Sequence, residues 1–134
     1  MLKRSWPAMS LVAVAALAGV TGFVAASRLA AQEATRKVES PAFSVSLPNV
    51  PGKALTGIVV RYAPGQSSPA HAHAGSVLAY ILSGSIRSEN SATGPVKVYQ
   101  AGESFFEPPG SQHLISENAS KTEPASLLAI FVGG

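Results

Sequence analysis

Three histidines are the residues of this sequence best suited to bind a metal ion. His71 and His73 stand two positions apart, and His113 follows a Pro-Pro-Gly turn. If the chain is extended there, His71 and His73 point to the same face, because side chains alternate along a strand. A distant strand could then add His113. Imidazole suits Fe, Mn, Ni, Zn and Cu, so the pattern predicts one divalent ion; the competing interpretation is surface or core histidines without a ligand.

The elements that position these histidines are expected to be short β-strands. Apolar, β-branched or alternating runs are typical of strands, and they occur at 42–47, 55–62, 77–82, 85–88, 96–100, 104–106, 114–116 and 127–132. Turns rich in proline and glycine separate them. No long helical period follows residue 31. Many short strands with regular turn signals predict an all-β sandwich or barrel.

The spacing of glycines and histidines resembles the two sequence motifs of the cupin superfamily. The residues that match are Gly65, His71-Ala72-His73 and Gly84 for the first motif, and Gly102, Pro108-Pro109-Gly110 and His113 for the second. In each motif, five residues separate the leading glycine from the next matching residue. The stretch 102–110 resembles a small single-domain bacterial cupin of the type-2 group, and the flanking strands extend the likeness across most of the chain after the leader.

This resemblance implies a fold and a set of ligands. The fold would be a single jelly-roll β-barrel over residues 41–134, with a metal ion near its centre. The resemblance assigns the ligand role to His71, His73 and His113. Similar cupins with three histidines include iron oxygenases that act on diketones or thiols, so the resemblance also suggests an oxidoreductase.

One position departs from the pattern of many metal cupins, which have a glutamate a few residues after the paired histidines. That position is Val77 here, and valine cannot bind a metal. Either the site uses three histidines alone, or Glu107 supplies a carboxylate as a ligand or as a neighbour of the ligands; a surface role for Glu107 is the alternative. Three neutral ligands would leave the full charge of the ion, which favours an anionic ligand.

Three aromatic residues are candidates for the wall of a ligand pocket. Phe105 and Phe106 lie in the second motif, and Tyr80 lies on an apolar strand near the first. A phenolic hydroxyl or an aromatic ring near a metal can orient a small ligand. Ordinary packing in the core is the competing interpretation for at least one of the phenylalanines, and the outer face of its strand is the alternative for Tyr80.

Residues 1–31 have the order of regions found in a secretory signal peptide. Basic residues come first, an apolar run follows from Leu11 to Val24, and small residues lead to Ala31. This is the order that export and cleavage require. An uncleaved membrane anchor is the alternative, although the run is shorter than the roughly 20 residues of a spanning helix. We therefore expect an exported protein, periplasmic or secreted, with residues 32–40 as a linker.

Composition excludes several classes of function. The formal net charge is +3, but three of the ten basic residues lie in residues 1–31, which leaves seven against seven glutamates. A basic face for nucleic acid is therefore not expected. The sequence has no cysteine and no aspartate, which excludes disulfides, thiolate chemistry and a Ser-His-Asp triad.

Two classes of function remain. The first is a metal-dependent oxygenase that acts on a small oxygen-bearing organic anion. The second is a cupin without catalytic activity that binds a metal or a small ligand; a metal-dependent isomerase or lyase is a further alternative. An apolar strand that is exposed could pair two copies of the chain, so the run from Leu127 to Val132 gives weak support to a homodimer. The support is weak since the same strand could equally lie inside its own barrel.

Overall fold

The computed structural model describes residues 38–133, which form β-strands and turns and no helix. The strands are β1 (Val38–Ser46), β2 (Ala54–Tyr62), β3 (Ser67–Ser68), β4 (His71–Ala72), β5 (Ser76–Ser83), β6 (Ser85–Asn90), β7 (Gly94–Gln100), β8 (Ser104–Glu107), β9 (Gln112–Asn118) and β10 (Ala125–Gly133). The predicted signal peptide at 1–31 lies outside the described residues. Within them, no helix is long and apolar enough to cross a membrane.

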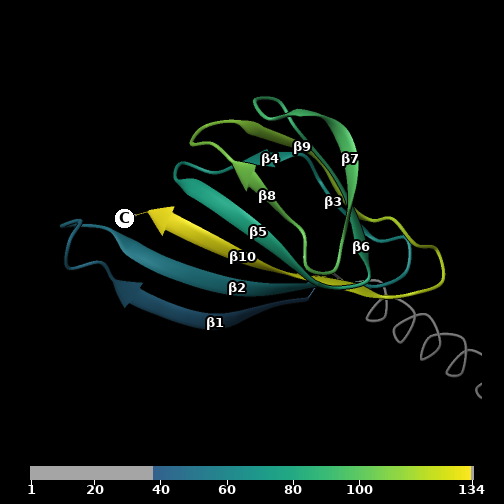
Figure 1. Ribbon diagram of the computed structural model, residues 1–134, viewed down its shortest axis with the longest axis horizontal. Coiled ribbons are helices and arrows are strands. Elements are labelled where there is room, and N and C mark those ends of the chain that lie inside the picture. The colour runs from purple at the N-terminus through teal and green to yellow at the C-terminus, as the bar shows by residue number, and fades with distance from the viewer. Residues whose placement is uncertain (1–37, 134) are drawn as a thin grey trace, which may run out of the picture. The chain divides into compact units, whose positions relative to one another are not determined.

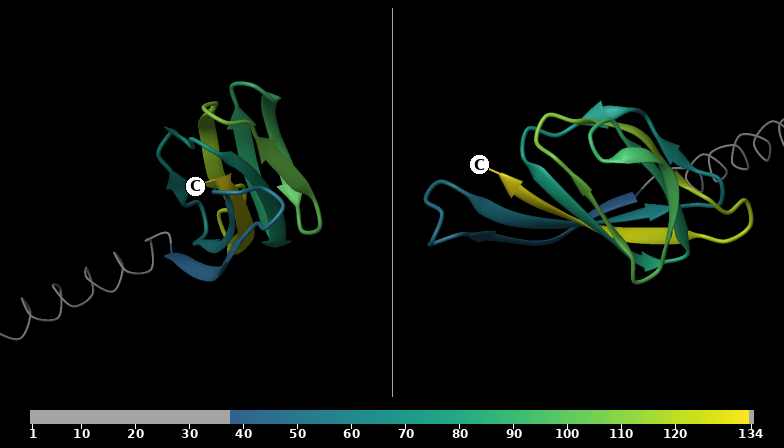
Figure 2. Two further views of the ribbon diagram at one scale, coloured as in Figure 1. Left: turned by 90° about the vertical axis from the view of Figure 1, so that its left-hand side faces the viewer. Right: turned by 45° about the horizontal axis from the view of Figure 1, so that its top comes forward.

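The strands form two antiparallel sheets with the interior between them (Figure 1). The first sheet has the order β1-β2-β10-β5-β8, and the second has the order β3-β9-β6-β7, with β4 also paired to β9. Figure 2 shows the two layers from further sides. Neighbouring strands such as β2 and β10 are far apart in sequence, as in a jelly roll. The predicted all-β jelly-roll barrel is confirmed.

The first sheet supplies most of the apolar core. Along β5, Val77, Ala79 and Ile81 are buried, and the residues between them face outward. This alternation is the period of two that a strand imposes on its side chains. Each fully buried aliphatic side chain contributes about 1.5–3 kcal/mol. The buried apolar residues are Val60, Tyr62, Val77, Ala79, Ile81, Ile86, Phe105, Ala125, Leu127 and Ala129.

Strand β1 begins earlier than the sequence indicates. The expected linker ends at residue 40, yet β1 starts at Val38 and continues through Pro41. Proline has no N–H for the strand ladder, but it is tolerated on an edge strand, and β1 pairs only with β2 in the described part of the chain. The pairing shifts between Pro41 and Phe43, which is a β-bulge. Pro41 therefore lies within an irregular edge strand and is not the residue at which the strand begins.

Gly84 is the point where the chain passes from the first sheet to the second. It lies between β5 and β6 with φ +67, a conformation that side chains with a Cβ rarely adopt. A Cβ at this position would also lie 2.5 Å from the carbonyl oxygen of Pro124 and 2.9 Å from the Cβ of Ala125. Glycine is required here for two reasons, the backbone angle and the space.

Candidate metal centre

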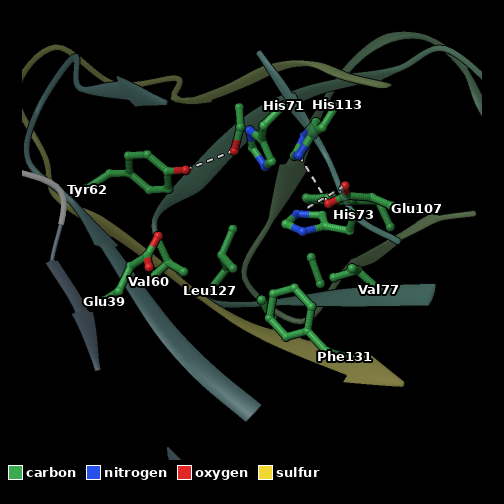
Figure 3. A pocket seen from close by; sticks show the side chains of 14 residues that line it. Glu39, Val60, Tyr62, His71, His73, Val77, Glu107, His113, Leu127 and Phe131 are labelled. Carbon is green, nitrogen blue, oxygen red and sulfur yellow. Dashed lines mark hydrogen bonds and ion pairs between the residues drawn. The ribbon is translucent and has the colours of Figure 1, made fainter. Parts of the chain in front are cut away.

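The structure brings the three histidines together at one end of the interior. His71 on β4 pairs directly with His113 on β9, and their ring centroids are 5.1 Å apart. His73 follows β4, and its ring centroid lies 4.9 Å from that of His71. The pairing of β4 with β9 therefore joins the two sequence motifs. Figure 3 shows the three rings beside the carboxylate of Glu107.

Glu107 enters this cluster from the strand next to Val77. Val77 on β5 and Glu107 on β8 are paired residues, and both point inward, with 1% and 4% of their surface exposed. Oε1 of Glu107 lies 3.1 Å from Nδ1 of His113, and Oε2 lies 3.9 Å from Nε2 of His73. The carboxylate missing at Val77 therefore reaches the interior from the opposite position, and Glu107 is not a surface residue.

These residues form a cluster that could hold a metal ion. His71, Glu107 and His113 each offer a donor atom, and the three atoms lie within 4.8 Å of one another. Metal–ligand distances of about 2.0–2.2 Å would be reached by a small inward movement of these side chains. The cluster mixes imidazole and carboxylate, which agrees with the alternative in which Glu107 supplies a carboxylate and not with a site of three histidines alone. His73 lies at its margin.

Both ring nitrogens of His113 have a partner. Besides Nδ1 beside Glu107, Nε2 lies 2.8 Å from the hydroxyl of Ser88 on β6. A serine, a histidine and a carboxylate in this order resemble a hydrolytic triad. However, Ser88 is buried and does not line the pocket described below, so its hydroxyl is not offered to a substrate. Ser88 points inward because buried and more exposed side chains alternate along β6. The sequence alone does not show which of the two faces of β6 is the inner one.

A cavity of about 60 Å³ lies against the cluster (Figure 3). Its lining residues are Glu39, Val60, Tyr62, His71, His73, Val77, Ala79, Phe105, Glu107, His113, Ser116, Leu127, Ala129 and Phe131. Among residues 39–133, no lysine or arginine contributes to this lining. The hydroxyl of Tyr62 bonds to Ser68 at 2.7 Å and to Ser116 at 2.9 Å. The cavity is small and apolar on one side, with hydroxyl groups and the cluster on the other.

Of the three aromatic candidates for the pocket wall, Phe105 alone lines it. Its ring centroid is 5.5 Å from that of His113. Tyr80 and Phe106 face outward and are 43% and 45% exposed. This corrects the expectation for both residues. Ala79 and Phe105 point inward. Tyr80 follows Ala79 and Phe106 follows Phe105, so both must point to the opposite face of the sheet, because side chains alternate along a strand.

Comparison with known proteins agrees with this geometry. A family model described as a cupin domain matches residues 58–131, which include the whole cluster. The chain belongs to the cupin family. A solved structure of a conserved protein of unknown function from Streptococcus pyogenes is 18% identical, with 75% of this cupin and 76% of that chain covered and a TM-score of 0.57. At this identity the likeness concerns the fold.

Two further structures extend the comparison. A conserved protein with a double-stranded beta-helix domain from Klebsiella pneumoniae is 21% identical, covers 77% of this cupin and 86% of its own chain, and has a TM-score of 0.59. Oxalate oxidase in complex with the substrate analogue glycolate is 26% identical over 57% of this cupin and 41% of that enzyme, with a TM-score of 0.52. No curated protein matches the sequence.

Proposed function

We propose that this cupin binds one divalent metal ion through His71, His73, His113 and Glu107. The observation that carries the proposal is Oε2 of Glu107, which is buried and has no hydrogen-bond partner within residues 38–133. A buried polar atom without a partner is costly, and a cation would compensate it. Imidazole and carboxylate together suit Fe, Mn, Ni or Zn.

The ligand that we propose is a small organic anion with oxygen donor atoms. One carboxylate ligand leaves a divalent ion with a single positive charge, so the site still attracts an anion, although less strongly than three histidines alone would. The cavity of about 60 Å³ has room for a few non-hydrogen atoms. The similarity to oxalate oxidase with bound glycolate supports a ligand of this size and charge.

The activity that we propose is oxidation of this anion by O₂. A redox-active ion such as Fe or Mn would supply the one-electron chemistry that reaction with O₂ requires. The chain would hold the ion, keep its ligands oriented and limit access of bulk water. The apolar side chains of Leu127 and Phe131 line the cavity and are suited to that last role.

The test is O₂ consumption by the full-length protein loaded with Fe(II) or Mn(II). Glycolate and oxalate are the first substrates to try, followed by diketones, catechols, flavonols and small thiols. Turnover that disappears in His113→Ala supports the oxygenase. Ethylene glycol, a neutral compound of similar size to glycolate, is the control for charge. Equal responses to glycolate and ethylene glycol would contradict a preference for anions.

A binding protein without catalytic activity is the second candidate. The observation that favours it is the shortage of acid–base groups: apart from the His/Glu cluster, Glu39 and Tyr62 are the titratable residues of the described part of the chain that line the cavity. This candidate predicts saturable binding of metal and glycolate with no O₂ consumption. Turnover without O₂ would instead indicate a metal-dependent isomerase or lyase.

We also propose that two copies of the chain pair through the outer face of the first sheet. Leu78 pairs with Ile130 on one side and with Phe106 on the other, and the ring of Phe43 covers Gly57, the other partner of Ile130. An apolar row therefore crosses all five strands of this sheet. In contrast, Leu127 points inward and is buried, so only alternate residues of the terminal strand are available to a partner.

Matched charge substitutions test this pairing. Leu78→Lys places a charge in the apolar row, whereas Leu114→Lys places one at an equally exposed leucine on β9 of the second sheet. Sedimentation equilibrium of the full-length protein should give a dimer for the wild type and for Leu114→Lys, and a monomer for Leu78→Lys. A monomeric wild type, or a dimer that survives Leu78→Lys, contradicts the proposal.

Export to the periplasm or the medium is a further part of the proposal. It rests on the order of basic, apolar and small residues in residues 1–31. N-terminal sequencing of the protein recovered from each cell fraction tests it. Cleavage after Ala26 or Ala31 is the expected result, and a full-length chain in the cytoplasm contradicts export.

A further inference from the structure

Two hydroxyl groups line a part of the cavity that the proposed metal site does not use. Tyr62 is the last residue of β2 and Ser116 lies on β9, so the pair joins the first sheet to the second. Their oxygens are 2.9 Å apart, and both side chains are buried and line the cavity. Figure 3 shows Tyr62 at the opposite end of the pocket from Glu107, with its hydroxyl directed inward.

A β-bulge in β9 turns Ser116 into this cavity. Side chains alternate along a regular strand, so residues three apart point to opposite faces. The pairing of β9 with consecutive residues of β6 skips from Ile115 to His113 and leaves Leu114 with no partner among the residues of β6. This extra residue shifts the alternation, and both His113 and Ser116 are buried against the cavity. Bulges of this kind re-aim side chains and are frequent beside functional sites.

Three hydroxyl groups form a chain that leaves one hydrogen atom unused. Besides Ser116, Tyr62 bonds to Ser68 on β3 at 2.7 Å. The three groups have one hydrogen each, and the two bonds that join them use one hydrogen each. Within the described part of the chain, no other group bonds to these hydroxyls. Because Tyr62 and Ser116 line the cavity and Ser68 does not, either of the first two can donate the third hydrogen to a group in the cavity.

The surroundings of the hydroxyl pair suit a neutral oxygen group on a short carbon chain. Among residues 39–133, no lysine or arginine lines the cavity, so a second negative charge at this end would be buried without a cation. The aliphatic side chains of Val60 and Leu127 also line the cavity, and they suit methylene groups. A hydroxyl group on the ligand could both accept a hydrogen bond from the pair and donate one to it.

We propose that Tyr62 and Ser116 form a second subsite of the cavity, which binds the hydroxyl end of a short hydroxycarboxylate whose carboxylate end binds at the ion. This inference rests on the proposed metal site, and it narrows the proposed small anion to a class with its charge at one end. The backbone positions of His113 and Ser116 are about 10 Å apart at the rise of a strand. Side chains from both positions occupy part of that span, so we expect an acid of three or four carbon atoms.

The experiment compares hydroxylated acids with plain acids of the same length. Full-length protein loaded with Zn(II) is titrated calorimetrically with glycolate, β-hydroxypropionate and γ-hydroxybutyrate, and with acetate, propionate and butyrate. The affinity ratio within each pair measures what the hydroxyl group contributes. We expect a ratio of about 3–10 for the three-carbon or the four-carbon pair. A ratio near unity in every pair overturns the inference alone, whereas a wild type that retains no zinc overturns the proposed metal site as well.

Two variants show whether the ratio comes from this subsite. Tyr62→Phe and Ser116→Ala should each reduce the ratio to about 1–2 and leave the affinity for the plain acid nearly unchanged. Because both acids bind to the same variant, a loss of stability cancels in the ratio. Tyr80→Phe, which removes a hydroxyl from the outer face of the first sheet, is the control and should keep the wild-type ratio. A ratio that stays at the wild-type value in both variants means that the ligand hydroxyl binds the ion itself, and it overturns the inference.

Discussion

A carboxylate can reach one point of a barrel interior from either of two paired strands. Val77 and Glu107 face each other across β5 and β8, and both side chains point inward. The glutamate expected on one strand is replaced by a glutamate on the other. As a result, a carboxyl group lies beside the imidazoles, and it would partly compensate the charge of an ion bound there.

The Glu107→Gln variant separates the effect of this side chain on metal affinity from its effect on the stability of the fold. The amide keeps the shape of the side chain but removes the charge, so metal affinity should fall by at least about 10-fold. The stability of the metal-free protein should be unchanged or higher by up to about 2 kcal/mol, because a buried carboxylate is costly to desolvate. Calorimetric titration and urea unfolding measure the two effects. Glu103→Gln, a change just before β8 at a side chain that is 43% exposed, is the control for metal affinity.

Glu103 itself predicts a dependence of stability on pH. The backbone N–H of Gln100 and the Lys97 ammonium group stabilise its carboxylate and lower its pKa. The pKa is lower in the folded state, so the stabilisation is present above the unfolded pKa and is lost as pH falls through the folded pKa. Glu103→Gln should therefore be less stable than the wild type at neutral pH. Urea unfolding in acid, below the Glu103 pKa, should show no difference; a gap that persists there would contradict this account.

Among the elements, Gly84 joins β5 of the sheet that supplies most of the core to β6 of the sheet that carries His113. Gly84→Ala should lower the free energy of unfolding by about 2–4 kcal/mol, since it adds both a strained backbone angle and a steric overlap. Gly52 also has a positive φ, but a Cβ there would meet nothing within 4 Å. Gly52→Ala should therefore cost only about 1–2 kcal/mol. Thermal unfolding measures both, and equal losses would contradict the role of the steric overlap.

The periodicity of the sequence predicts the longer strands but not the short ones. The runs at 55–62 and 77–82 correspond to β2 and β5, and the resemblance to the cupin family implies the jelly roll. The two-residue strands β3 and β4 are too short to show any period, and they exist because they pair with β9. The pairing of β4 with β9 places His71 beside His113. The two motifs predict that these histidines lie close together, but they do not predict the short strand β4.

The residue types of the candidate site are predictable from the sequence, whereas the face of the sheet to which each side chain points is not. The family resemblance indicates His71, His73 and His113 as candidate ligands, and the departure at Val77 leads to Glu107 as a further candidate. Ser88, in contrast, is not indicated, because a serine inside an alternating strand is ordinary until the inward face is known. The same missing information placed Tyr80 in the expected pocket, whereas the phase set by Ala79 turns it outward. Register and face are properties of the folded sheets and not of local sequence.

Across the molecule, the two sheets differ in the kind of side chain that they bury. Apolar core residues come mainly from β2, β5 and β10, which are neighbours or near neighbours in the first sheet. Buried polar residues come mainly from β6 and β9 of the second sheet; the full set is Ser88, Asn90, Glu107, His113, Ser116 and Asn118. A chain without cysteine therefore relies on one sheet for its core, while the other bears the cost of a polar interior.

The metal content of the purified full-length protein is the decisive test of the proposed metal site. The protein is unfolded, stripped of metal, refolded with equal amounts of Fe(II), Mn(II), Ni(II) and Zn(II) under anaerobic conditions, separated from free ions and analysed by mass spectrometry of the elements. We predict about one ion in total per chain for the wild type and little retained metal for His113→Ala. A wild type that retains almost no metal, or a His113→Ala variant that retains as much as the wild type, would contradict it.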